Sequence, residues 1–127
     1  MAQTLDQERA QYAWGCATKN AMVDGYREMA KGAPALIMGN GLMPALAFYH
    51  SRTGGNKKPA ELMLADVLGW LAKRQMLSSN RFPDAMKAFF GSGSQDYMRA
   101  TDETLAMLKW LRQFADAVSD STATQAK

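Results

Sequence analysis

The sequence contains very little of the material from which strands, disulfides and metal sites are built. Its 127 residues include one cysteine, one histidine, three valines and one isoleucine. A lone cysteine, Cys16, excludes a disulfide within the chain. Metal sites need clustered ligands, and because no Cys-x-x-Cys or Glu-x-x-His pair is present we expect neither a metal nor another cofactor. The scarcity of β-branched residues, with no alternating run of them, argues against a sheet.

The sequence also lacks an apolar run of about 18 residues, so it predicts no membrane-spanning segment. Its first residues, MAQTLDQERAQ, are polar and include acids, which is unlike a secretory signal. With 47% hydrophobic and 21% charged residues, the composition is that of an ordinary globular domain. These features predict a cytoplasmic protein of a bacterium or archaeon, with no membrane partner.

Helix-forming residues dominate what is present, and their spacing predicts an all-α protein, a compact single domain of about six helices. Thr4 and Gln7 have the spacing of a capping box, which predicts where the first helix starts. Pro34 predicts a kink or a break in the second helix. The helices are expected at about residues 4–24, 26–38, 42–51, 59–77, 83–90 and 95–118. The polar residues 119–127 predict a disordered tail after a helical domain of residues 1–118.

The glycine-rich stretch Gly39-Asn40-Gly41 raises the possibility of a phosphate-binding loop. Such a loop needs a strand before its glycines, whereas a helix is expected here, and Pro44 stands where a dinucleotide-binding motif has its third glycine. A glycine in the left-handed conformation ends a helix well. The stretch therefore predicts a corner between two helices, with Pro44 in the first turn of the second one.

Few residues are suited to catalysis. Cys16 and His50 are the one pair from which a Cys–His dyad is conceivable. Because Cys16 falls on the inward stripe of the first helix and His50 at the end of the third, we expect no catalytic residue and no enzyme activity. Trp14, Trp70 and Trp110 are expected to anchor the core, with an interface anchor as the alternative for one of them. The ten methionines, at helical spacing, are expected mainly in the core.

Positive charge is concentrated in the middle third of the chain. Residues 41–81 hold six basic and two acidic residues, whereas the segments on either side are close to neutral. Such a surplus is typical of a surface that meets a polyanion such as RNA, with a solvated helix face as the alternative. The candidate RNA-binding residues, chosen by charge, are Arg52, Lys57, Lys58, Lys73 and Arg74.

One segment carries a family resemblance. Residues 34–48, PALIMGNGLMPALAF, resemble the core of the small helical subunit of the type III-B CRISPR (Cmr) effector complex, an RNA-guided machine that targets RNA. Weaker similarities occur in the same order elsewhere, at residues 9–13 (RAQYA), 26–29 (YREM) and 108–115 (LKWLRQFA). The likeness extends to about residue 118.

The resemblance implies a non-catalytic subunit that serves antiviral defence. Copies of it would stack along the effector filament beside the other Cmr subunits, and basic side chains would contact the guide–target RNA. Sequence-independent contacts suit such a machine because base pairing supplies the specificity. Two other functions stay open from the residues alone: a helix-turn-helix-like DNA-binding regulator, and a small helical adaptor that binds only protein.

Overall fold

Six α-helices and one short 3₁₀ helix make up the described part of the chain, residues 2–52 and 54–126, in the computed structural model. The all-α prediction is therefore confirmed. The elements are α1 (Leu5–Lys19), α2 (Tyr26–Asn40), α3 (Leu42–Ser51), η1 (Gly54–Asn56), α4 (Lys57–Lys73), α5 (Phe82–Gly91) and α6 (Ser94–Ala126). No described helix is long and apolar enough to cross a membrane.

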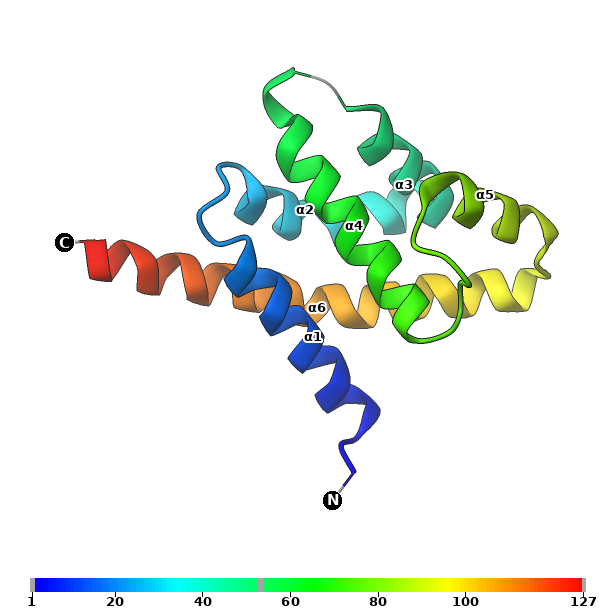
Figure 1. Cartoon of the computed structure of the whole chain (residues 1–127), viewed down its shortest axis with the longest axis horizontal. Helices are drawn as coiled ribbons and strands as arrows, with labels where there is room; N and C mark the ends of the chain where they lie inside the picture. Colours follow the sequence, from blue (N-terminus) through cyan, green and yellow to red (C-terminus); the bar gives the residue numbers. More distant parts are fainter. Residues whose placement is uncertain (1, 53, 127) are drawn as a thin grey trace.

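The long helix α6 is the element on which the others assemble (Figure 1). α1 crosses it, and α2 and α4 also pack against it. α4 lies at the centre, where it contacts α2, α3 and α6, while α5 packs on α3. The buried side chains form one apolar core, whose largest fully buried members are Trp70, Tyr26 and Tyr49.

The first helix begins where the sequence predicts and ends earlier. The Thr4 hydroxyl accepts the N–H of Gln7 at 3.1 Å, and the Gln7 side chain accepts the N–H of Thr4 at 2.8 Å, so the capping box is confirmed. α1 then ends at Lys19 and not at Asp24, because Asn20 caps it and carries its side chain into the core, where it is buried.

Gly41 forms the corner between α2 and α3. Its φ of +94° and ψ of 161° lie in a region that is essentially restricted to glycine, so the predicted helix–corner–helix is confirmed. Pro44 lies in the first turn of α3, as expected. Of the two alternatives at Pro34, the break is wrong, since α2 continues through Pro34 as one helix, and the kink stays a prediction.

α4 differs from the prediction at both ends. It begins at Lys57, before Pro59, which is tolerated in a first turn because the N–H groups there have no partner within the helix. It ends at Lys73 because Gln75 adopts a positive φ of 62° and reverses the chain. The N–H groups of the next two residues then bond to the carbonyl oxygen of Leu71 at 2.9 and 3.3 Å.

The assigned end of α6, Ala126, lies beyond the predicted helix end near residue 118. Side chains from residue 119 onward lie outside the described part of the structure. The predicted domain boundary at residue 118 and the predicted tail at 119–127 fall in that region and stay predictions.

Two expectations about the core are confirmed only in part. Trp14 lies at the rim of the α1–α6 contact with 49% of its surface exposed, whereas Trp70 is buried and Trp110 is partly buried. Met63 and Met107 are fully buried, and Met29, Met43 and Met86 are partly buried and pack against the core, whereas the other four described methionines are exposed. Helical spacing places a residue on a stripe but does not show which edge of the stripe a neighbouring helix covers. The exposed methionines are Met22, Met38, Met76 and Met98.

Candidate nucleic-acid interface

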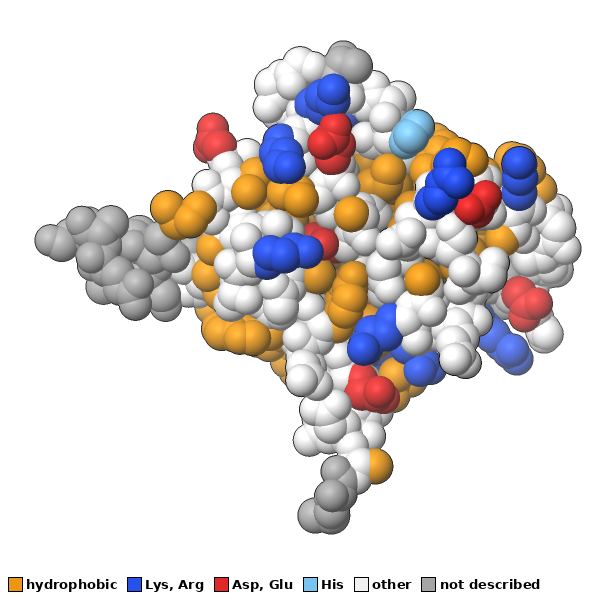
Figure 2. Space-filling view, in the orientation of Figure 1, with side chains coloured by type: hydrophobic (Ala, Val, Ile, Leu, Met, Phe, Trp, Pro, Cys, Tyr) orange, Lys and Arg blue, Asp and Glu red, His pale blue; other side chains and the backbone are white. Residues whose placement is uncertain are grey.

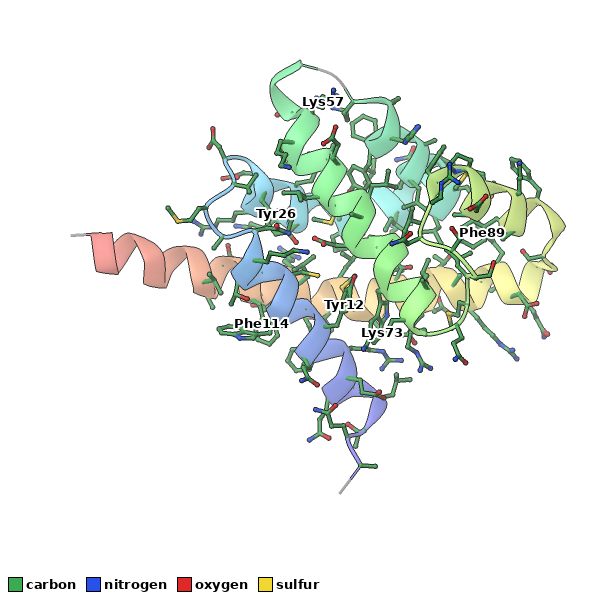
Figure 3. The ribbon with its side chains drawn as sticks, in the orientation of Figure 1. Tyr12, Tyr26, Lys57, Lys73, Phe89 and Phe114 are labelled. Atoms are coloured by element: carbon green, nitrogen blue, oxygen red, sulfur yellow. The ribbon has the colours of Figure 1, made fainter. Side chains whose placement is uncertain are left out.

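The five candidate RNA-binding residues divide into two groups at the two ends of α4. Arg52, Lys57 and Lys58 lie at its N-terminal end, while Lys73 and Arg74 lie at its C-terminal end. Sixteen helical residues separate Lys57 from Lys73, a distance of about 24 Å at 1.5 Å per residue. Figure 3 shows these two labelled lysines at opposite ends of the helix. The structure therefore does not bring the five residues together into one basic patch.

The N-terminal group forms an exposed basic corner, which we define as Arg52, Lys57 and Lys58. Both lysines are exposed, and the Lys57 ammonium lies 3.9 Å from the carboxylate of Glu61, an exposed pair that contributes little stability. The guanidinium of Arg52 lies over the ring of Phe48, 5.0 Å from its centroid, and its Nε has no hydrogen-bond partner among the described residues. The ring holds the guanidinium in place while its outer nitrogens remain available to a phosphate.

The C-terminal group lies among acidic and amide side chains. Lys73 lines a polar pocket of about 240 Å³ together with Glu8 and the phenol of Tyr12. The positive charge of Arg74 acts on Glu103, whose pKa it helps to lower. Arg74 is half-buried, and its Nε has no hydrogen-bond partner among the described residues. The basic corner is the stronger candidate for a phosphate contact because it holds two exposed lysines, whereas the C-terminal group holds one.

Glu103 is the best-satisfied buried carboxylate in the described structure. Arg9 donates to it from Nε at 2.7 Å and from a terminal nitrogen at 2.8 Å, and the indole N–H of Trp70 donates at 3.1 Å. Burial, the largest single influence, would raise the pKa of Glu103, but the Arg9 and Trp70 hydrogen bonds and the positive charges of Arg9 and Arg74 together outweigh it and hold that pKa below its usual value. The cluster joins α1, α4 and α6. Because these donors bind the carboxylate of Glu103, we assign it a structural role.

A second buried carboxylate, Asp66, was not identified from the sequence. One of its side-chain oxygens accepts the hydroxyl of Tyr26 at 2.6 Å and the amide N–H of Asn20 at 3.2 Å, and its carbonyl oxygen accepts the hydroxyl of Tyr12 at 2.6 Å. Burial raises the pKa of Asp66, while hydrogen bonds from the side chains of Tyr26 and Asn20 oppose the rise. The sequence did hold one signal for this residue. Asp66 is an acid inside the apolar run Leu64-Ala-Asp-Val-Leu68, and its position falls on the buried arc of α4.

Cys16 and His50 do not form a dyad. Cys16 faces the core of α1, and burial raises the pKa of its thiol to about 12, so it stays protonated and unreactive at neutral pH. His50 is exposed and stacks on Phe82 with ring centroids 4.1 Å apart. Within the described residues, no group of three His, Cys, Asp or Glu side chains is placed to hold a metal ion.

The helix-turn-helix alternative does not fit the geometry. In that alternative α4 would be the recognition helix, which has to present an exposed face to a DNA groove. α4 instead packs against three other helices and is buried over a wide arc. The connection before it also contains the separate helix η1.

Two exposed apolar surfaces lie near different parts of α6. Near its C-terminal half, the ring of Phe114 contacts Trp14 edge-on at 5.3 Å and stacks on Trp110 at 5.7 Å. Near its N-terminus, Phe90 of α5 and Met98 of α6 are 72% and 62% exposed. Phe114 follows Met98 by sixteen positions, which places the two surfaces about 24 Å apart along the helix.

The comparisons with known proteins point to one family. The family model described as "CRISPR-associated protein (Cas_Cmr5)" matches residues 5–118. A relative from Thermus thermophilus, the CRISPR system Cmr subunit Cmr5, is 33% identical over 118 residues, which are 91% of this chain and 96% of the relative. The crystal structure of a Cmr5 family protein from the same organism superposes with a TM-score of 0.75 at 28% identity, covering 92% of this chain and 98% of that one.

The fold and these similarities define a small all-helical protein of the CRISPR systems. The chain belongs to the Cmr5 family of CRISPR-associated proteins. The resemblance to the small helical subunit of the type III-B CRISPR (Cmr) complex is thereby confirmed.

Proposed function

We propose that this subunit is non-catalytic, that its copies stack along the Cmr effector filament, and that it contacts guide–target RNA through basic side chains. The exposed basic corner carries the proposal of RNA contact. There, Lys57 and Lys58 extend from the start of α4, and Arg52 follows the end of α3, five residues before Lys57 in the chain. Contacts of this kind bind the phosphate backbone without reading bases, as a guide-programmed complex requires.

Single-stranded RNA is expected to bind the chain in a salt-sensitive manner, and the double variant Lys57→Glu/Lys58→Glu is expected to weaken that binding. Two lost phosphate contacts should lower the slope of log affinity against log salt by about 1.4, since each contact with a single strand contributes about 0.7. Fluorescence anisotropy between about 50 and 200 mM salt measures the slope, with an RNA duplex and a DNA duplex for comparison.

The matched control for the basic corner is Lys87→Glu/Lys109→Glu, which makes the same charge change at exposed lysines of α5 and α6. An equal loss of RNA affinity in this control would show that net charge matters and that the corner does not. If the native chain does not bind RNA at low salt, the result favours the alternative function, a small helical adaptor that binds only protein. Lys73→Glu, tested separately, reports on the other end of α4.

The proposed stacking is supported by the two exposed apolar surfaces. Stacking along a filament is head-to-tail, so it joins two different surfaces of neighbouring copies. The cluster around Trp14 and the pair Phe90 and Met98 offer such surfaces on different parts of the molecule. Tryptophan is also among the residues that contribute most to protein interfaces.

Trp14→Glu is expected to weaken self-association by at least about tenfold, because interface anchors of this type contribute about 2 kcal/mol or more. Sedimentation velocity over a range of concentrations measures the change. Ala35→Glu, which places the same charge on an exposed position of α2, is the control and is expected to associate like the native chain. Unchanged association of the Trp14 variant would exclude this surface from stacking.

A further inference from the structure

A groove between α3, α4 and α5 is used by neither the proposed RNA contact nor the proposed stacking. Its volume is about 330 Å³, at the lower end of the range of about 300 to 1,000 Å³ for ligand sites, so it fits one or two side chains. Figure 2 shows hydrophobic side chains gathered on this side of the molecule, between the upper end of α4 and the histidine. Its lining comprises His50, Glu61, Leu64, Ala65, Leu68, Asn80, Arg81, Phe82 and Pro83.

The floor and one wall of the groove are apolar. Leu64, Ala65 and Leu68 come from successive turns of α4 and form the floor, and Leu68 is buried. The parallel stack of His50 on Phe82 joins α3 to the start of α5 and lines the groove, with the rings inclined by only 8°. A hollow of this kind, open to solvent and lined by aliphatic carbon, favours a large apolar side chain over a polar ligand.

The rim of the groove offers one arginine without a partner in the described part of the chain. Arg81 is exposed, and its guanidinium has no ion pair or hydrogen bond within the described residues. Glu61 is the one acid among the groove's lining residues, and its carboxylate lies 3.9 Å from the ammonium of Lys57. The acid next along the chain, Asp84, accepts the hydroxyl of Ser79 at 2.9 Å. A carboxylate on a ligand would therefore find Arg81 available.

We propose that this groove binds a short segment of a neighbouring Cmr protein subunit that presents a large apolar side chain next to a carboxylate. The apolar side chain fills the hollow over Leu64 and Leu68, and the carboxylate pairs with Arg81. The inference rests on the proposed function, in which the chain works inside a multi-subunit complex. RNA fits the groove less well, because bases bind by stacking on exposed aromatic faces, and Phe82 and His50 are stacked on each other.

Co-expression with the other Cmr subunits tests the site. Ala65→Trp fills the hollow from an exposed position of α4, and Arg81→Glu reverses the charge at position 81 of the rim. Each is expected to lower the fraction of the chain that co-purifies with a tagged Cmr backbone subunit by at least about fivefold. Ala88→Trp and Lys87→Glu make the same changes on exposed positions of α5 outside the groove and are expected to co-purify normally.

RNA binding by the isolated variants separates this proposal from the proposed function. Ala65→Trp is expected to bind single-stranded RNA within twofold of the native chain. Normal co-purification with weakened RNA binding would assign the groove to nucleic acid and overturn the proposal, and no change in either measurement would overturn it too. If Lys57→Glu/Lys58→Glu does not affect RNA binding, that result counts against the proposed RNA contact and not against the proposal for the groove.

Cross-linking identifies the chemistry of the occupant. Ala65→Cys introduces an accessible thiol, and the native Cys16 does not compete because it is buried. A photoreactive group attached at position 65 in the assembled complex is expected to capture a protein segment that contains a large apolar residue with Asp or Glu within about one helical turn. Capture of RNA, or of a segment without an acid, would contradict the proposal.

Discussion

Arg9→Met is expected to destabilise the protein by about 3 to 5 kcal/mol at neutral pH, the range measured when one partner of a buried ion pair is removed. Glu103 is only 6% exposed and would keep the Trp70 indole as its side-chain donor. Chemical unfolding followed by circular dichroism measures the loss. Arg99→Met is the matched control, since Arg99 lies 3.9 Å from Asp96 in an exposed setting and is expected to change stability by less than about 0.5 kcal/mol.

The loss in Arg9→Met should depend on pH. The pKa of Glu103 in the native fold lies below its usual value, so its stabilising contribution is present above the usual pKa of Glu and is lost as pH falls through the lower, native pKa. Without Arg9 this contribution is absent. The difference in the free energy of unfolding between Arg9→Met and the native protein should therefore shrink as pH is lowered from about 7 towards about 3. A difference that stays constant with pH would mean that Arg9 stabilises the fold through packing alone.

The second large effect is expected at Asp66. Asp66→Ala leaves the hydroxyl of Tyr26 and the amide of Asn20 buried without their acceptor, at about 1 to 3 kcal/mol for each donor, so a total loss of about 2 to 6 kcal/mol is expected. Asp66→Asn keeps an oxygen for these donors and removes a buried negative charge. It is expected to be at least as stable as the native protein at neutral pH.

The pH dependence at Asp66 has the opposite sign to that at Glu103. Burial raises the native pKa of Asp66, so the protonated form stabilises the fold at low pH and that contribution is lost as pH rises through the raised pKa. Asp66→Asn cannot titrate and should lose this part of the pH profile. Thermal unfolding of both proteins across the acidic range measures it. A lower stability of the Asn variant at neutral pH would show that the carboxylate is bound better than its burial implies.

The sequence was sufficient for the features that depend on local chemistry. The capping box at Thr4, the glycine corner at Gly41 and the helical class each follow from residue types at fixed spacing. It was insufficient where the outcome depends on a neighbouring helix. Trp14 lies on α1, and the arrangement of α1 on α6 leaves it half exposed, while Met22 is exposed in the turn that follows α1.

The candidate site shows the same division. Charge counting located the basic third of the chain, but it could not show that α4 separates Lys57 from Lys73 by its full length. Nor could it pair Arg9 with Glu103, which are 94 residues apart in sequence. Such pairings depend on tertiary packing, and they decide which cations are bound to the protein's own acids.

The most direct test of RNA contact is photo-cross-linking within the assembled Cmr complex, loaded with guide RNA and a target RNA that carries 4-thiouridine. Mass spectrometry of the cross-linked peptides locates the contact on this chain. We expect RNA adducts on the peptides that contain Arg52, Lys57 and Lys58, and their loss in Lys57→Glu/Lys58→Glu. A fully assembled complex in which this chain carries no adduct, or carries adducts only on α6, would contradict RNA binding by the basic corner.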